Sequence, residues 1–190
     1  MRNGRKARRL GAEDWARAAL DAIAAGGVGA VAVETLAKAV GATKGSCYWH
    51  FADRDAVVAA ALARWEAAET DETIARLEAL PTPGERLAAV LRAGLGGELG
   101  GAVDAALLAD AADPRVAPVL RRVTAARLAY TEKLFRKLGL SGRAARERAL
   151  LAYAAYVGHH ALQRAAPSLM PRGAAARSYF EHVVGSLVPV

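Results

Sequence analysis

Residues 41–51, GATKGSCYWHF, combine a cation, hydroxyl groups, an imidazole and aromatic rings at close spacing. Lys44 and Ser46 can hydrogen-bond to the edges of nucleic-acid bases, and the glycine between them lets the backbone approach closely. Tyr48 and His50 can donate hydrogen bonds to phosphate oxygens. This mixture is too polar for a core helix and too aromatic for an ordinary solvated surface. It therefore predicts contact with a polyanion.

Three short helices are expected to position this segment. Apolar spacing predicts a first helix over residues 12–25, ended by a pair of glycines, and a second helix over residues 33–40. Gly41 stops the second helix, because a positive φ costs glycine little. Thr43 is the expected N-cap of a third helix that runs to about Phe51.

The second and third helices have the pattern of a helix-turn-helix. Ala37 is the small residue where the two helices cross, and Gly41 is the glycine of the turn. The apolar residues expected to hold the helices together are Leu36, Val40, Cys47 and Phe51. The polar residues of the third helix then point outward, and its N-terminus adds a partial positive charge toward phosphate.

The spacing Gly41-x-Thr43-x-Gly45-x-x-Tyr48-x-His50-Phe51, followed by Arg54, resembles the TetR family of bacterial transcriptional regulators. The resemblance extends from Trp15 to Asp55. It implies that Tyr48, His50 and Arg54 hold the phosphate backbone and that residues 43–46 face the major groove. Trp49 would either pack on sugars or brace the helix. The residues expected at DNA are Thr35, Thr43, Lys44, Gly45, Ser46, Tyr48, Trp49, His50 and Arg54.

Two residues of the second helix depart from the family pattern. Ala32 stands where the family favours a Thr or Ser cap, so one N–H group lacks a side-chain partner, at a cost of up to about 1 kcal/mol. Glu34 replaces a common basic residue and would repel a nearby phosphate. Thr35 can still supply a backbone contact from this helix.

Longer helices are expected after residue 53. Their start signals are Asp53, a capping box from Thr82 to Glu85, the pair Asp113-Pro114, and Ser141, whose helix should reach Ala165. A last helix carries residues 179–187, and the glycines of residues 94–101 are interpreted as a helix end and loop. The sequence predicts an all-α fold. A three-helix DNA-binding domain (residues 1–53) precedes a five- to six-helix bundle for ligand binding and dimerisation (residues 54–190).

Composition favours a soluble helical protein of a reducing compartment. The chain has 190 residues, a net charge of +7, 54% hydrophobic residues and a single cysteine. Neither a signal peptide nor a membrane span is recognisable, so we expect a cytoplasmic protein. The first nine residues carry five basic side chains and no acid. This arm is either a DNA contact or a solvated tail.

The family resemblance implies a homodimer on a palindromic, double-stranded operator and a small-molecule effector. Small residues on the helix after Ser141, and apolar residues on the last helix, are candidates for the dimer interface: Ala154, Gly158, Ala161, Ala165, Phe180, Val183 and Leu187. Candidates for lining an effector cavity are Trp65, Glu98, Tyr130, Tyr153, Tyr156 and His159. The abundance of Ala, Leu and Val indicates an apolar ligand.

Residues that suggest catalysis or metal binding have plainer explanations. His159 and His160 point about 100° apart on a helix and cannot easily share a metal ion. Cys47 falls on the inward face of its helix. We therefore expect a ligand-responsive regulator, most simply a repressor, without enzymatic activity, cofactor or metal. The alternatives are a helical small-molecule enzyme and a protein that binds anionic partners nonspecifically.

Overall fold

The computed structural model describes residues 10–95 and 101–188, which form helices and their connections with no strand among them. The all-α prediction is confirmed. The elements, in chain order, are α1 (Ala12–Gly26), the 3₁₀ turn η1 (Val28–Ala30), α2 (Val33–Val40), α3 (Lys44–Tyr48), α4 (Arg54–Glu66), the π-helical turn η2 (Ala67–Asp71), α5 (Glu72–Glu78), α6 (Pro83–Leu95), α7 (Gly101–Ala109), α8 (Ala117–Lys137), α9 (Gly142–Ala165) and α10 (Gly173–Leu187).

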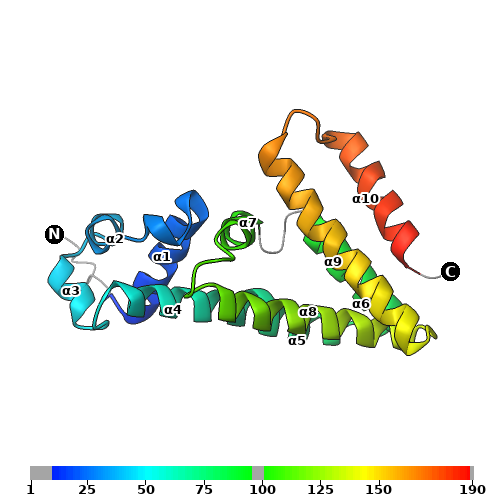
Figure 1. The fold of residues 1–190 in the computed structure, drawn as a ribbon, viewed down its shortest axis with the longest axis horizontal. Helices are drawn as coiled ribbons and strands as arrows, with labels where there is room; N and C mark the ends of the chain where they lie inside the picture. The colour runs from blue at the N-terminus through cyan, green and yellow to red at the C-terminus, as the bar shows by residue number, and fades with distance from the viewer. Residues whose placement is uncertain (1–9, 96–100, 189–190) are drawn as a thin grey trace, which may run out of the picture.

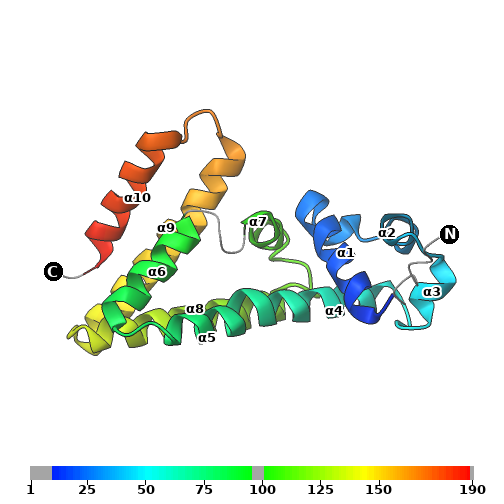
Figure 2. The same cartoon turned by 180° about the vertical axis from the view of Figure 1, so that it is seen from behind.

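One long helical rod connects the two ends of the molecule (Figures 1 and 2). It consists of α4, η2 and α5, which follow one another without a break, and α8 runs beside it. Helices α1, α2 and α3 pack at the start of the rod, while α6, α9 and α10 lie at its far end. Helix α7 packs on both α1 and α9 and so lies between the two ends.

A first hydrophobic core holds α1, α2 and α3 onto the rod. Trp15, Cys47 and Val57 are fully buried in it. The same core takes in Leu107 of α7 and Val123 of α8. Burial of each large apolar side chain stabilises the fold by roughly 1.5–3 kcal/mol. Helices α1, α2 and α3 are thus packed directly on elements that follow residue 53, and the division at residue 53 stays a prediction.

A second core lies among α5, α6, α8, α9 and α10. Leu87, Leu134 and Phe135 are fully buried there, and Leu187 of α10 is 4% exposed. Val183 packs against the same core. Leu187 was expected to contact a partner subunit, but its side chain is used within the protomer. The apolar face of α10 covers α6, and a dimer contact by Leu187 stays a prediction.

The start signals at Thr43, Asp53 and Ser141 are confirmed. Thr43 Oγ1 accepts a hydrogen bond from the Ser46 N–H at 3.3 Å, and Asp53 Oδ1 accepts one from Ala56 N–H at 2.8 Å. Gly41 has the left-handed conformation (φ 68°), and Ala32 provides no side-chain cap to α2. These short-range hydrogen bonds fix where each helix begins, and so determine the direction in which α3 projects.

Two elements differ from the expected pattern. Helix α7 was not expected, and it begins at Gly101, where the predicted helix end and loop finishes; its Ala106 and Leu107 are buried in the first core, and residues 96–100 of the predicted loop lie outside the described residues. Helix α8 begins at Ala117, later than the Asp113-Pro114 signal, because the Asp113 carboxylate caps the preceding turn through the Arg115 N–H. No helix in residues 10–95 and 101–188 is both long and apolar enough to cross a membrane.

Candidate nucleic-acid interface and ligand cavity

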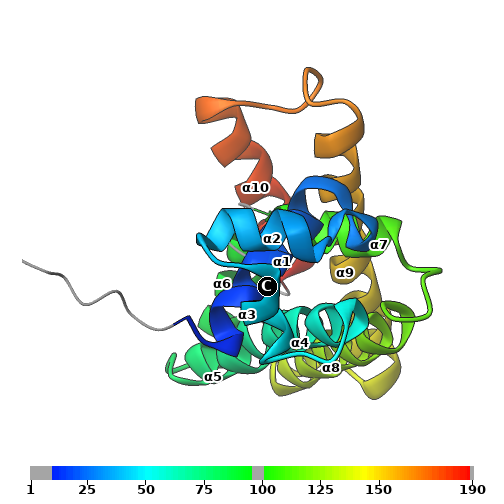
Figure 3. The ribbon, with the colours of Figure 1, turned by 90° about the vertical axis from the view of Figure 1, so that its left-hand side faces the viewer.

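Helix α3 lies at one end of the molecule (Figure 3). Its polar and aromatic side chains are largely exposed there. Tyr48 is 53% exposed and Trp49 is 88% exposed, and Lys44 and His50 are exposed beside them. Cys47 faces inward and is fully buried, and burial raises the pKa of its thiol. A tryptophan with this exposure braces nothing within the protomer, so it is available to a partner.

Glu34 of α2 forms an ion pair with Lys44, at the first turn of α3. The hydrogen bond from Lys44 lowers the pKa of Glu34. The sequence predicts that Glu34 repels phosphate. The structure adds that Glu34 also neutralises Lys44, the cation predicted to lie nearest the bases. Any contact between Lys44 and DNA therefore competes with this pair.

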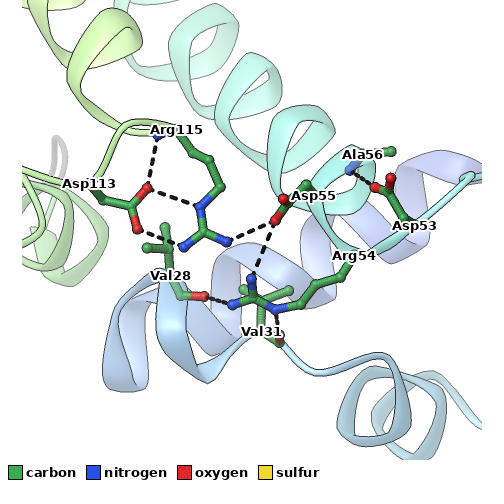
Figure 4. Close-up of polar contacts among 8 residues, drawn as sticks. All are labelled: Val28, Val31, Asp53, Arg54, Asp55, Ala56, Asp113 and Arg115. Carbon is green, nitrogen blue, oxygen red and sulfur yellow. Dashed lines mark hydrogen bonds and ion pairs between the residues drawn. The ribbon is translucent and has the colours of Figure 1, made fainter.

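Arg54, the first residue of α4, is bound within the protein (Figure 4). Its Nε donates to the carbonyl of Val31 at 2.6 Å, and its Nη2 donates to the carbonyl of Val28 at 2.5 Å. Its Nη1 pairs with Asp55. All three nitrogens of the guanidinium thus have protein partners. A phosphate contact by Arg54 stays a prediction, and this geometry favours a different role, in which Arg54 fixes α4 to η1.

Arg115 joins this cluster from the segment before α8 (Figure 4). It pairs with Asp113 at 2.6 Å and with Asp55 at 2.8 Å. The hydrogen bonds from Arg115 lower the pKa of Asp113 to about 2, and those same carboxylates raise the pKa of Arg115. Figure 4 shows that the cluster links η1, α4 and the start of α8.

Asp110, directly after α7, forms a second connection to the DNA-binding helices. Its Oδ2 accepts a hydrogen bond from the Val28 N–H at 2.7 Å. Gly27 makes room for it: its φ is 74°, and a Cβ added there would lie 2.4 Å from Asp110 Oδ2. Glycine is therefore required at this position both for its conformation and for space.

A cavity lies among α5, α6, α8, α9 and η2, near the middle of the molecule. The cavity has a volume of about 80 Å³, and its open mouth brings the empty space to about 690 Å³. Its lining is mostly apolar, with Leu77, Leu91 and Leu95 among the residues that contribute. Such a surface suits an apolar ligand.

A buried polar cluster closes one part of this cavity. The Asp104 carboxylate accepts hydrogen bonds from Trp65 Nε1 at 2.6 Å, from Arg127 and from the Tyr156 hydroxyl. Burial opposes the charge on Arg127, but Asp104 beside it outweighs that effect and raises its pKa. Burial, together with Asp104, also raises the pKa of Tyr156. The cluster joins α4, α7, α8 and α9 at the cavity.

The structure brings together three of the six predicted cavity residues: Tyr130, Tyr153 and Tyr156. Trp65 is buried in the first core and does not line the cavity itself, but it contacts Arg127, which does, and donates to Asp104. His159 is buried against Tyr179 and Phe180 and does not line the cavity. Burial lowers its pKa. Glu98 and the basic residues 1–9 lie outside the described residues.

Sequence reasoning missed Asp104, Arg127 and Thr70. Asp104 interrupts the apolar run of α7, and Arg127 lies on the inward side of α8. A charge within an apolar stripe was the available signal for both. Thr70 carried no signal, because nothing in the sequence marks the π-helical turn in which it lies.

Helix α9 leaves an apolar surface uncovered within the protomer. Leu150, Leu151 and Leu162 are each more than half exposed. The predicted dimer residues Ala154, Ala161 and Ala165 are exposed on the same helix, whereas Gly158, Phe180 and Val183 are half-buried. Exposed leucines next to small residues form a surface suited to close packing of a second helix.

The described geometry agrees with comparisons to known proteins. Residues 16–61 match the model of the bacterial regulatory proteins of the tetR family. No curated protein matches the sequence. Among solved structures, a transcriptional regulator from Rhodococcus sp. Rha1 is 25% identical, with a TM-score of 0.73 and 94% of each chain covered.

Two further structures are similar over nearly the whole chain. A TetR-family transcriptional regulator from Agrobacterium tumefaciens is 20% identical, with a TM-score of 0.71, 90% of this chain and 96% of that chain covered. The regulator FadR from Bacillus subtilis, in complex with stearoyl-CoA, is 15% identical, with a TM-score of 0.69 and coverages of 93% and 97%. The matched helix-turn-helix segment is similar to that of the bacterial regulatory proteins of the tetR family, and the solved structures show that the whole chain shares the fold of such regulators.

Proposed function

We propose that the protein represses transcription as a homodimer on a palindromic operator, and that a small molecule in the cavity releases it from DNA. One observation carries this proposal: the exposed surface of α3 and the cavity lie at two places along the same helical rod. From Arg54 to Thr70 the rod spans 16 residues, or about 24 Å of helix. A change at the cavity can thus be transmitted to α3.

The DNA contacts come from α2 and α3. Lys44, Gly45 and Ser46 face the bases, and Tyr48 and His50 donate to phosphates. Trp49 packs on the sugar edge, where its ring stays largely exposed in the free protein. The full set of proposed DNA-contact residues is Thr35, Thr43, Lys44, Gly45, Ser46, Tyr48, Trp49, His50 and Arg54. Arg54 acts mainly by holding α4 against η1.

The homodimer forms through α9 and α10. Two copies of the exposed surface of α9 would bury the leucines and alanines that one protomer leaves open. The dimer then places two α3 helices in successive major grooves, roughly 34 Å apart. An effector that favours another separation weakens DNA binding by about 1–3 kcal/mol, a typical coupling free energy.

Two routes lead from the cavity to the DNA-binding helices. The first is the rod itself, where η2 lines the cavity and π-helical turns often mark functional sites. The second is α7, which carries Asp104 at the cavity and is followed by Asp110 at the Val28 N–H, six residues further on. A ligand that displaces either element moves α1 and α4 together, because they share one core.

The effector is a small, largely apolar molecule. The FadR relative holds stearoyl-CoA, whose acyl chain is apolar. The apolar lining of the cavity in this chain supports a ligand with similar apolar character. Regulators of this family are in general DNA-binding proteins without enzymatic activity, and we propose the same for this chain.

Fluorescence anisotropy with duplex DNA from the region upstream of the protein's own gene tests the proposal. Wild-type protein should bind a palindromic segment tightly, and Lys44→Ala and Tyr48→Phe should bind more weakly at an unchanged melting temperature. The exposed variant Arg17→Ala, far from α3 in sequence, serves as a control. Equal affinities for the palindrome and for a shuffled duplex would refute autoregulation, and unchanged affinity in both α3 variants would refute the assigned surface.

A further inference from the structure

The hydroxyl groups that line the cavity fall into two classes. Six lining residues carry a hydroxyl: Thr70, Thr73, Tyr130, Thr131, Tyr153 and Tyr156. Four of these hydroxyls bond within the protein, those of Thr73, Thr131, Tyr153 and Tyr156. Within the described residues, Thr70 Oγ1 and Tyr130 OH are buried without any hydrogen-bond partner.

Unpaired buried hydroxyls are costly, and native proteins seldom keep them without a reason. Thr70 is 2% exposed and Tyr130 is 7% exposed, so bulk water does not solvate either side chain freely. They come from different elements, η2 and α8, which face the same cavity. Burial raises the pKa of Tyr130, so its phenol stays protonated and can donate a hydrogen bond. Both residues line the cavity, and each carries a hydroxyl that no protein group binds.

Among the described residues, each charge that lines the cavity has a partner within the protein. Arg127 is paired with Asp104 and lies over the rings of Trp65 and Tyr156, at 5.5 and 5.9 Å from their centroids. The Asp104 carboxylate already accepts three hydrogen bonds. An anion would have to displace Asp104 from Arg127, and a cation would have to displace Arg127. Glu69, the other charged lining residue, has an interaction partner as well.

We propose that the cavity takes an uncharged, mainly apolar molecule with hydrogen-bonding oxygen atoms, which the hydroxyl groups of Thr70 and Tyr130 bind. The proposal rests on the proposed function, in which this cavity holds the effector. Thr70 gives it a regulatory consequence, because a hydrogen bond to its hydroxyl acts directly on the π-helical turn of the rod. Thr70 then contributes both to ligand recognition and to the coupling between the cavity and α4.

Three series of compounds with matched carbon chains test the ligand class on the full-length protein. They are the linear carboxylates of 8–14 carbons, their methyl esters and the corresponding primary amines, compared by thermal shift at pH 7.5. We expect the esters to raise the melting temperature most. The proposal is overturned if carboxylates or amines stabilise more at every length, or if no ester produces a shift.

Variants that remove a single hydroxyl test the two residues. Thr70→Val and Tyr130→Phe should each weaken ester binding by about 3- to 10-fold, since each loses one hydrogen bond. Without ligand, both should melt at the wild-type temperature or above, because an unpaired buried hydroxyl has been removed. Thr131→Val is the matched control: its hydroxyl bonds to the Arg127 carbonyl, so its melting temperature should not rise. Ester affinities equal to wild type in both variants would refute the assignment.

DNA binding measured with the same compounds separates the two proposals. If the esters bind through Thr70 and Tyr130 but leave DNA affinity unchanged, the ligand class stands and release by ligand fails. If a carboxylate or an amine releases DNA while the esters do not, release stands and the ligand class fails. Release by the esters, lost in Thr70→Val, supports both.

Discussion

The substitution Arg54→Lys separates two roles for the first residue of α4. The family resemblance implies a phosphate contact, which a lysine would keep as a point charge. The structure instead shows a forked contact, with Nε on the Val31 carbonyl and Nη2 on the Val28 carbonyl. A single ammonium group cannot reproduce the fork, because its donors radiate from one nitrogen. The lysine variant should therefore lose stability even when no DNA is present.

The magnitude follows from the lost contacts. A hydrogen bond from a charged donor is worth about 1.5–3 kcal/mol, and the variant loses at least one of two. The Arg54 side chain is 35% exposed, so water replaces part of the loss. The Val28 carbonyl also keeps a bond from the Val31 N–H at 3.3 Å. We expect a net loss of about 1.5 kcal/mol, which lowers the melting temperature by roughly 3–6 °C for a chain of this size.

Differential scanning calorimetry of the DNA-free protein measures this loss. Arg17→Lys is the matched control, since Arg17 is largely exposed and pairs only with Asp14 one turn away. The control should melt within about 1 °C of wild type, because exposed pairs contribute little. If Arg54→Lys has the melting temperature of the control and only its DNA binding is weaker, the forked contact does not stabilise the fold. The phosphate contact is then the better explanation.

Four other predictions follow from single contacts. Gly27→Ala should lower the free energy of unfolding by about 1–3 kcal/mol in urea denaturation, because the new Cβ meets Asp110 and the φ is positive; a wild-type midpoint would contradict this. Glu34→Gln should tighten DNA binding and steepen the slope of log K against log salt by roughly 0.9, because the freed Lys44 neutralises one more phosphate; weaker binding would mean that Glu34 orients Lys44. Asp113 has a folded pKa of about 2, below its ordinary 3.8, so its stabilising effect is complete above pH 4 and is lost as the pH falls through 2; an NMR titration of its carboxyl with a midpoint near 4 would contradict the ion pair. Leu151→Glu should convert the proposed dimer into a monomer in light scattering, because it places a charge in the exposed surface of α9; a variant that stays dimeric would exclude this surface.

Local hydrogen bonds could be predicted from the sequence. The caps at Thr43, Asp53 and Ser141 each join residues three apart, so residue type and spacing are sufficient to identify them. The division of α3 into a buried face and an exposed face was equally accessible, because helical periodicity places Cys47 inward.

Long-range polar contacts could not be predicted in this way. Arg54 binds carbonyls 23 and 26 residues away, and Asp110 binds an N–H group 82 residues away. The partners in these contacts are backbone groups of valines, so no residue type in the sequence indicates the contact. The unpaired hydroxyls of Thr70 and Tyr130 are harder still, because they are defined by the absence of a partner after folding. The exposed face of α3 was therefore predictable at residue level, whereas the cavity was predictable only as a region.

Selection of bound sequences from a random duplex library tests whether α3 recognises DNA, since it requires no knowledge of the operator. Wild-type protein should enrich one palindromic sequence with half-sites about one helical turn apart. Lys44→Ala, which leaves the fold intact, should enrich that sequence far less. Recovery of sequences with no shared motif, or the same motif at equal strength with Lys44→Ala, would contradict the assignment of α3 as the element that recognises DNA.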